Sequence, residues 1–216
     1  MMEEEYLKNK AKRILELLKQ AYPDEKGTEL NFSNPWELLV ATILAAQTPD
    51  KRVNEVTKVL FQKYRNVKDY AEADLSEMEE ILKKINFYRK KAQRIKEIAK
   101  IIMEKYNGEI PKSVEELTKL PGIGRKTANM VLANALNIIE GITVDTHVMR
   151  VSKRLGLTSY DDRNKIEKDL MGLYPKNEWF NVSNLFIAHG KRTCSAKKPK
   201  CDVCILKEIC PSKSIS

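Results

Sequence analysis

Hydrophobic positions recur along most of the chain at intervals of three and four residues, which is the spacing of an α-helix. Residues 88–106 form a long basic amphipathic stretch that stops at Asn107-Gly108, a pair typical of a helix end. Residues 162–173 and 178–189 have the same periodicity. The first such stretch, residues 3–21, gathers its apolar side chains near one face: Tyr6, Ile14, Leu17, Leu18 and Ala21.

Capping residues predict where several helices begin. In SNPWELLVATILAAQ, Asn34 suits the N-cap and Pro35 the first helical position. The helix that follows is apolar on nearly every side, which predicts that it is buried. Asp50 is expected to cap the next helix, through Tyr64. Two pairs fit a capping box: Ser76 with Glu79, and Ser113 with Glu116.

The second half of the chain adds two further helices. A helix rich in small residues is expected over 125–138, and Asp145 can cap another one through Leu155. The short segment GITV at 141–144 is the sole candidate strand in the sequence. We therefore predict an all-α fold.

Charge points to a polyanionic partner. The chain has 216 residues, with 39 Lys and Arg against 30 Asp and Glu, a net charge of +9. A basic surface suits nucleic acid first and a membrane surface second. No apolar run reaches the roughly 18 residues of a membrane span, and the N-terminus does not resemble a secretory signal. We expect a cytoplasmic protein.

All four cysteines lie near the C-terminus, in the pattern C-x6-C-x2-C-x5-C: Cys194, Cys201, Cys204 and Cys210. Clustered cysteines in a cytoplasmic chain suggest a metal centre more than disulfides. Four thiolates suit either zinc or a four-iron cluster. Structural zinc sites usually show two C-x2-C pairs, and only one is present, so the spacing favours iron–sulfur while leaving zinc open.

Five cations surround this cysteine pattern: Lys191, Arg192, Lys197, Lys198 and Lys200. A metal-tied loop would hold such side chains outward, where they could contact phosphates. A run of charges is also typical of an ordinary solvated face, and the sequence gives the two interpretations equal weight.

The segment LPGIGRKTANM combines a glycine turn with a helix start. Gly122 and Gly124 permit positive φ and close backbone approach, and a helix N-terminus presents N–H groups to an anion. The turn therefore predicts a phosphate site, with Arg125 beside it. Lys126 lies where the helix dipole and partial burial both favour the neutral amine, the form that a nucleophile requires. Taken alone, the turn favours a phosphate-binding lysine over a nucleophilic one.

Asp145, in ITVDTH, is expected to cap a helix and also to accept a proton or face a positively charged sugar. Glycosidic cleavage passes through an oxocarbenium-like state, which a carboxylate stabilises. His147 and His189 have no metal-ligand partner at useful spacing, so we assign both to structural hydrogen bonds.

Three ordered motifs, LPGIGRKTAN, VDTH and the cysteine pattern, resemble the endonuclease III family over about Trp36 to Cys210. That family consists of bifunctional DNA glycosylases of the helix–hairpin–helix superfamily with an iron–sulfur cluster. The resemblance implies that Lys126 is the Schiff-base nucleophile and Asp145 the catalytic aspartate. It also implies a [4Fe–4S] cluster on the four cysteines.

The resemblance implies further DNA contacts. Gln47 matches the glutamine that fills the gap left by a flipped base, and Phe87 stands where the family usually has a leucine wedge. Thr48-Pro49 departs from the commoner Ala-Thr and is expected to stiffen that loop. Phosphates are expected at the glycine turn and at exposed lysines: Gly122, Gly124, Arg125, Lys191, Lys197 and Lys198.

The resemblance also implies two lobes. Residues 26–139 would form a six-helix domain with the helix–hairpin–helix, and residues 1–25 with 140–216 an iron–sulfur cluster domain. The active site is expected in the cleft, with Lys126 on one lobe and Asp145 on the other.

The expected activity is base excision repair of double-stranded DNA with damaged bases or abasic sites. The enzyme would remove oxidised pyrimidines and cut the strand by β-elimination, as a monomer, associated with the nucleoid in a prokaryote. Two alternatives stay open. One is a mismatch-specific glycosylase of the same fold, for G:T, G:U or adenine, although such relatives lack this lysine. The other is a non-catalytic DNA-binding module.

Overall fold

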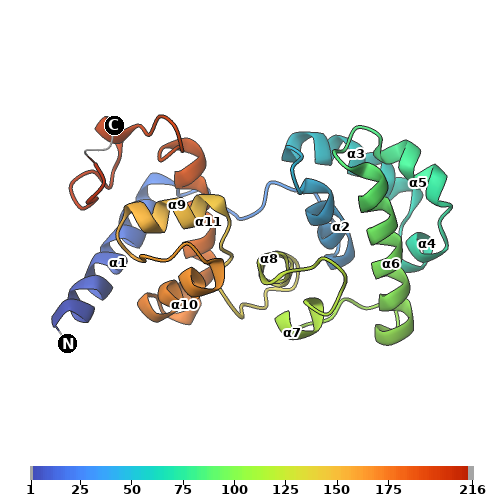
Figure 1. The fold of residues 1–216 in the computed structure, drawn as a ribbon, viewed down its shortest axis with the longest axis horizontal. Helices are drawn as coiled ribbons and strands as arrows, with labels where there is room; N and C mark the ends of the chain where they lie inside the picture. The colour runs from blue at the N-terminus through green and yellow to red at the C-terminus, as the bar shows by residue number, and fades with distance from the viewer. Residues whose placement is uncertain (1, 214–216) are drawn as a thin grey trace. The chain divides into compact units, whose positions relative to one another are not determined.

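The computed structural model describes residues 2–213, and over this range it is helical with no strand (Figure 1). The chain divides into two compact units. One runs from Thr28 to Glu140, and the other combines the residues up to Gly27 with those from Gly141 onward. The boundaries that the resemblance implied for the two lobes were 25/26 and 139/140. Residues 1 and 214–216 of the expected cluster domain lie outside the described residues.

The unit of residues 28–140 is built around a buried central helix. Its helices are α2 (Pro35–Ala45), α3 (Asp50–Lys63), α4 (Val67–Glu72), α5 (Leu75–Leu82), α6 (Tyr88–Tyr106), α7 (Val114–Leu117) and α8 (Arg125–Ala135). Leu38, Leu39 and Leu44 of α2 are fully buried, as the all-round apolar pattern predicted. Helices α3, α6 and α8 all pack against α2, so this unit has its own hydrophobic core.

The expected start of α2 is confirmed, and two other predicted caps are wrong. Asn34 accepts a hydrogen bond from the Glu37 N–H, with Pro35 in the first turn. The N-cap of α3 is Pro49, so Asp50 is its first helical residue instead of its cap. Helix α5 is capped by Asp74, two residues before the predicted Ser76.

The second unit has a separate core. It contains α1 (Met2–Ala21), α9 (Thr146–Arg154), α10 (Arg163–Leu173), α11 (Trp179–Arg192) and two short 3₁₀ turns, η1 (Lys176–Glu178) and η2 (Cys201–Val203). Helix α11 packs against both α1 and α9. The residues at the centre of this core are fully buried: Ile14, Leu18, Val148, Ile166, Leu170 and Phe186.

The segment GITV at 141–144 has no regular secondary structure and is not a strand, contrary to the sequence expectation. Ile142 and Val144 are buried in the core, and the Thr143 N–H donates to Ser183 Oγ at 2.9 Å. A side chain thus satisfies this buried backbone group in place of a partner on a neighbouring strand.

Helix α8 ends three residues earlier than predicted, with Asn137 in a left-handed conformation. Within residues 2–213, no helix is long and apolar enough to cross a membrane.

Candidate functional site

The glycine turn joins α7 to α8. Ser113 caps α7 through the Glu116 N–H at 3.2 Å, and the chain then passes through Gly122 at φ +71°. A Cβ at Gly122 would also lie 2.7 Å from Cζ of Arg94 on α6. The positive φ therefore demands glycine at this position, whereas the Arg94 guanidinium could move away from a Cβ.

Gly124 does not have the positive φ that the sequence analysis allowed for it. Its φ is −97°, which any residue adopts, so it needs no glycine for conformation. No atom lies within 4 Å of where its Cβ would be, and the residue is exposed. Between the glycines, Ile123 is buried and anchors the turn. The backbone at Gly124 is thus open to close approach from outside.

Arg125 and Lys126 are the first two residues of α8. Arg125 is exposed, whereas Lys126 is partly buried. The N-cap residue is Gly124, so no cap side chain accepts a hydrogen bond from the first N–H groups of the helix. A helix start of this kind is suited to an anion.

Gln47 and Phe87 are exposed at two loop positions with strained backbone. Gln47 follows the end of α2 at φ +57°, and Phe87 precedes α6 at φ +58°. Neither is glycine, and a bulky residue in the left-handed region is uncommon. Phe87 nevertheless leaves 62% of its surface exposed. Both exposed side chains therefore belong to residues with an unfavourable backbone conformation.

Asp145 begins α9, as predicted. Its Oδ1 accepts hydrogen bonds from the N–H groups of His147 and Val148, both at 2.8 Å. The residue is half-buried. One carboxylate oxygen therefore satisfies two N–H groups of the first turn and fixes the orientation of the side chain.

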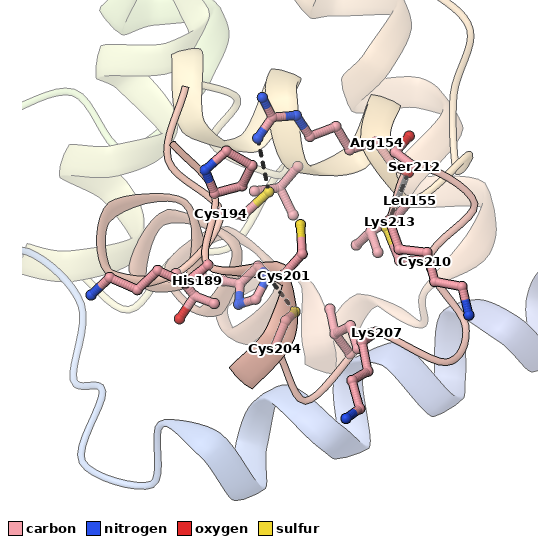
Figure 2. Close-up of a pocket in the computed structure, with 15 residues that line it drawn as sticks. Arg154, Leu155, His189, Cys194, Cys201, Cys204, Lys207, Cys210, Ser212 and Lys213 are labelled. Atoms are coloured by element: carbon pink, nitrogen blue, oxygen red, sulfur yellow. Dashed lines mark hydrogen bonds between the residues drawn. The ribbon is translucent and has the colours of Figure 1, made fainter. Parts of the chain in front are cut away.

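The four cysteines line one pocket beside α9 and α11 (Figure 2). Burial raises the pKa of the Cys204 and Cys210 thiols, so a positive centre is needed to favour the thiolates. Arg154 supplies one charge, because its guanidinium donates to Cys194 Sγ at 3.2 Å. Within residues 2–213, no three His, Cys, Asp or Glu side chains gather to hold a single metal ion. Four thiols around a shared pocket fit a cluster with one thiolate at each iron.

Two arginines of α9 hold the cysteine loop in place. Arg150 donates to the carbonyl oxygens of Cys194 at 3.0 Å and Gly190 at 2.9 Å. Arg154 donates to the carbonyl oxygens of Ser195 at 2.7 Å and Ala196 at 3.0 Å. Neither arginine could be predicted from the sequence, because the contacts span some forty positions and no local pattern marks them.

His189 is fully buried beside the pocket. Its Nδ1 lies 3.0 Å from the Tyr22 hydroxyl, and its Nε2 lies 3.7 Å from Cys204 Sγ. Burial lowers the pKa of His189 to about 4, so the imidazole is neutral. The predicted hydrogen-bonding role is confirmed, and it reaches a cysteine. His147 likewise contacts Arg150, at 3.1 Å.

The five cations around the cysteines are all exposed. Arg192 pairs with Glu25 at 2.8 Å and lies over the Tyr22 ring. Lys197 and Lys198 are exposed in the loop between Cys194 and Cys201, and Lys191 is exposed near the end of α11. The loop therefore presents positive charge to solvent while its backbone is fixed by α9.

Comparisons with known proteins identify the family. Residues 40–176 match the model of the HhH-GPD superfamily base excision DNA repair proteins, and residues 194–210 match the iron–sulfur binding domain of endonuclease III. The chain is 47% identical to endonuclease III of Synechocystis sp. over 97% of its length and 95% of the relative's. The chain belongs to the endonuclease III family. Against the endonuclease III of Bacillus subtilis the identity is 46%, over 84% of the chain and 83% of the relative.

Solved structures agree with this assignment. A trapped endonuclease III–DNA covalent intermediate has a TM-score of 0.91 and 42% identity, over 96% of this chain and 97% of that one. A thermostable thymine-DNA glycosylase, at 21% identity and a TM-score of 0.86, shares the fold. The predicted all-α glycosylase fold and [4Fe–4S] cluster are confirmed. The chain is a base excision repair DNA glycosylase with AP lyase activity.

Proposed function

We propose that the protein removes oxidised pyrimidines from duplex DNA and cleaves the resulting abasic site through a Schiff base on Lys126. The observation that carries the proposal is the position of Lys126, partly buried on the first turn of α8 directly after the glycine turn. It is supported by the similarity to an endonuclease III trapped as a covalent intermediate with DNA. The protein's partner is duplex DNA that contains damaged bases or abasic sites.

The DNA backbone would be held at two places. The exposed glycine turn at Gly122 and Gly124 and the exposed Arg125 would bind one phosphate at the start of α8. Lys191, Lys197 and Lys198 would bind others near the cysteine loop. Neither contact reads a base, which suits an enzyme that must act at damage in any sequence.

The damaged nucleotide has to leave the base stack before its C1′ can be reached. Gln47 and Phe87, both exposed and both held in left-handed backbone conformations, would occupy the vacated space. An inserted side chain offsets part of the unstacking free energy. The larger ring of Phe87, in place of leucine, would stack on the bases beside the gap.

The glycosylase step begins with the neutral amine of Lys126, which attacks C1′ and forms an N–C1′ bond. The C1′–N bond to the base breaks, and the base leaves with the electron pair and takes up a proton. Asp145 would accept a proton from the attached nitrogen. It would also stabilise positive charge on the sugar as the base departs.

The lyase step follows from the imine. The C1′–O4′ bond opens, O4′ takes a proton, and a protonated Schiff base forms on Lys126. Loss of a C2′ proton then expels the 3′ phosphate with the C3′–O electron pair, and water hydrolyses the Schiff base to release the enzyme.

When bound, the [4Fe–4S] cluster supplies a cross-link for residues 194–210, while Arg150 and Arg154 hold the backbone of that loop.

Borohydride trapping tests the proposal. The protein is mixed with duplex DNA that carries thymine glycol, sodium borohydride is added, and the covalent adduct is resolved on a denaturing gel. We expect an adduct from the unaltered protein and none from Lys126→Gln, while Lys119→Gln, an exposed lysine before the turn, forms it normally.

The rival functions give other results. A mismatch-specific enzyme would release thymine or adenine from mismatches and leave thymine glycol intact. A non-catalytic module would bind the duplex without releasing any base.

We place the enzyme in the cytoplasm on the nucleoid, where such DNA is found.

A further inference from the structure

Lys91, on the first turn of α6, is a buried lysine whose ammonium contacts another part of the same unit. It is 6% exposed. Its Nζ donates to the carbonyl oxygens of Leu44 at 2.8 Å and Ala46 at 2.6 Å, and to Thr48 Oγ1 at 3.3 Å. Leu44 lies in the last turn of α2, and Ala46 and Thr48 flank Gln47 in the loop that follows.

The position suits a cation even though it is buried. The last carbonyl groups of a helix lack intrahelical partners and carry the negative end of the helix dipole. Lys91 satisfies two of them, so it acts as a C-terminal cap for α2 from a distant helix. These acceptors are uncharged, and burial lowers the pKa of Lys91 to about 8. A buried ammonium that costs free energy to desolvate needs a compensating role.

Asn86 makes a second connection between the same two segments. Its backbone N–H donates to Thr48 Oγ1 at 3.3 Å, and its Nδ2 donates to the Gln47 carbonyl oxygen. Thr48 is buried, and its hydroxyl accepts from both Lys91 and Asn86. We call Lys91, Thr48 and Asn86 together the Lys91 bridge.

The Lys91 bridge lies between the two strained positions. Gln47 is flanked by acceptors of Lys91 at Ala46 and Thr48, and Phe87 directly follows Asn86. Left-handed backbone at a non-glycine residue is unfavourable and persists only where the surroundings fix it. Hydrogen bonds on both sides of Gln47, and beside Phe87, are such surroundings.

We propose that Lys91 is a positioning residue that ties the loop of Gln47 to the start of α6, so that Gln47 and Phe87 meet DNA as one preformed unit. The proposal rests on the proposed function, in which these two side chains fill the gap left by the flipped nucleotide. Lys91 itself touches neither substrate nor the reacting atoms in this account.

The test uses Lys91→Met, which keeps the length of the side chain and removes its donors. The matched control is Lys90→Met, an exposed lysine on the same turn. A duplex carrying a tetrahydrofuran abasic analogue opposite 2-aminopurine gives a fluorescence rise when the opposite base is unstacked, with no bond cleavage. Single-turnover excision of thymine glycol and binding to undamaged duplex are measured alongside.

We expect Lys91→Met to lose most of the fluorescence rise and to slow excision by about ten- to a hundredfold. Its affinity for undamaged duplex should stay within about threefold, because the phosphate-binding residues lie elsewhere. In a Gln47→Ala/Phe87→Ala background, Lys91→Met should have little further effect on excision, since its action runs through those side chains. Lys90→Met should behave as the unaltered protein does.

An unchanged fluorescence rise and excision rate in folded Lys91→Met would overturn the proposal, as would full additivity with the double variant. Should Lys91→Met fail to fold, the exposed Asn86→Ala, which removes the side-chain link to Gln47, must reduce the fluorescence rise. If the unaltered protein forms no borohydride adduct, the proposed function is wrong. If it forms the adduct, and Lys91→Met keeps the fluorescence rise and the excision rate of the unaltered protein, only the role proposed for Lys91 is wrong.

Discussion

Backbone strain at single residues is concentrated at the positions predicted to meet DNA. Four non-glycine residues of the described range have positive φ: Gln47, Phe87, Asn107 and Asn137. Asparagine tolerates this conformation, and both asparagines lie just past the ends of helices. Glutamine and phenylalanine do not favour it, and both are exposed, so packing of their side chains does not explain their presence.

Phe87→Gly should therefore be more stable than Phe87→Ala, and both variants should be less active than the unaltered protein. Glycine adopts φ +58° freely, and only an exposed ring is lost, so we expect unfolding free energy to rise by about 0.5–1 kcal/mol relative to Phe87→Ala. Chemical denaturation measures the stability, and single-turnover excision measures the activity, which should fall in both variants. Equal stability of Phe87→Gly and Phe87→Ala would contradict a strained backbone.

Lys91 makes stability depend on pH in a defined direction. Its pKa is about 8 in the folded protein and 10.5 in the unfolded chain, so the unfolded state binds more protons between these values. Unfolding free energy should rise with pH across this window, because the cost of burying the charged amine disappears. Denaturation of the unaltered protein and of Lys91→Met at pH 7 to 10 measures it. As the pH rises, the unfolding free energy of the unaltered protein should increase relative to that of Lys91→Met. The same pH dependence in both proteins would contradict a lowered pKa of Lys91.

At the scale of elements, α9 combines several tasks. Its first turn orients Asp145, and its later turns send Arg150 and Arg154 to the cysteine loop. One helix therefore links a proposed catalytic carboxylate to the segment that binds the cluster. The two roles of Asp145, as a cap and as a proton acceptor, can be separated by substitution.

Asp145→Asn should keep the cap and lose the chemistry. The amide oxygen can still accept from the His147 and Val148 N–H groups, so thermal stability should change little. Excision of thymine glycol should fall by at least about a hundredfold, since the carboxylate charge is gone. Asp145→Ala should lose the activity and about 0.5–2 kcal/mol of stability as well. Full activity in Asp145→Asn would leave the residue with a capping role alone.

How far the sequence predicts these elements depends on how local the determinants are. The caps at Asn34 and Asp145 were found because side chain and N–H lie within three residues. The caps predicted at Asp50 and Ser76 are wrong because nearby residues, Pro49 and Asp74, take the N-cap position instead. Arg154 and Lys91 were missed, since their partners are some forty positions away and only folding brings them together.

At the scale of the whole molecule, the chain has two hydrophobic cores, one in each unit. The central α2 and the glycine turn belong to residues 28–140, whereas α9 and the cysteines belong to the other unit. Each core is built from its own helices, so loss of one unit's order need not unfold the other.

Removal of the cluster should act on one unit. In Cys201→Ser we expect loss of the brown colour and of bound iron, together with faster amide exchange in residues 194–210 and at the end of α11. Arg150 and Arg154 lose an ordered partner in that loop, so exchange in α9 should also rise. Exchange in α2 and α6 should be unchanged. A colourless unaltered protein that contains zinc, or a variant that unfolds throughout, would contradict this expectation.

The central claim is that Lys126 forms the covalent bond to DNA, and mapping the adduct tests it most directly. The borohydride-reduced complex with thymine glycol DNA is digested with protease and nuclease, and the modified peptide is sequenced by mass spectrometry. We predict a single modified lysine, Lys126, in the peptide that begins α8. A modification at another lysine, or at the N-terminal amine, would contradict the account.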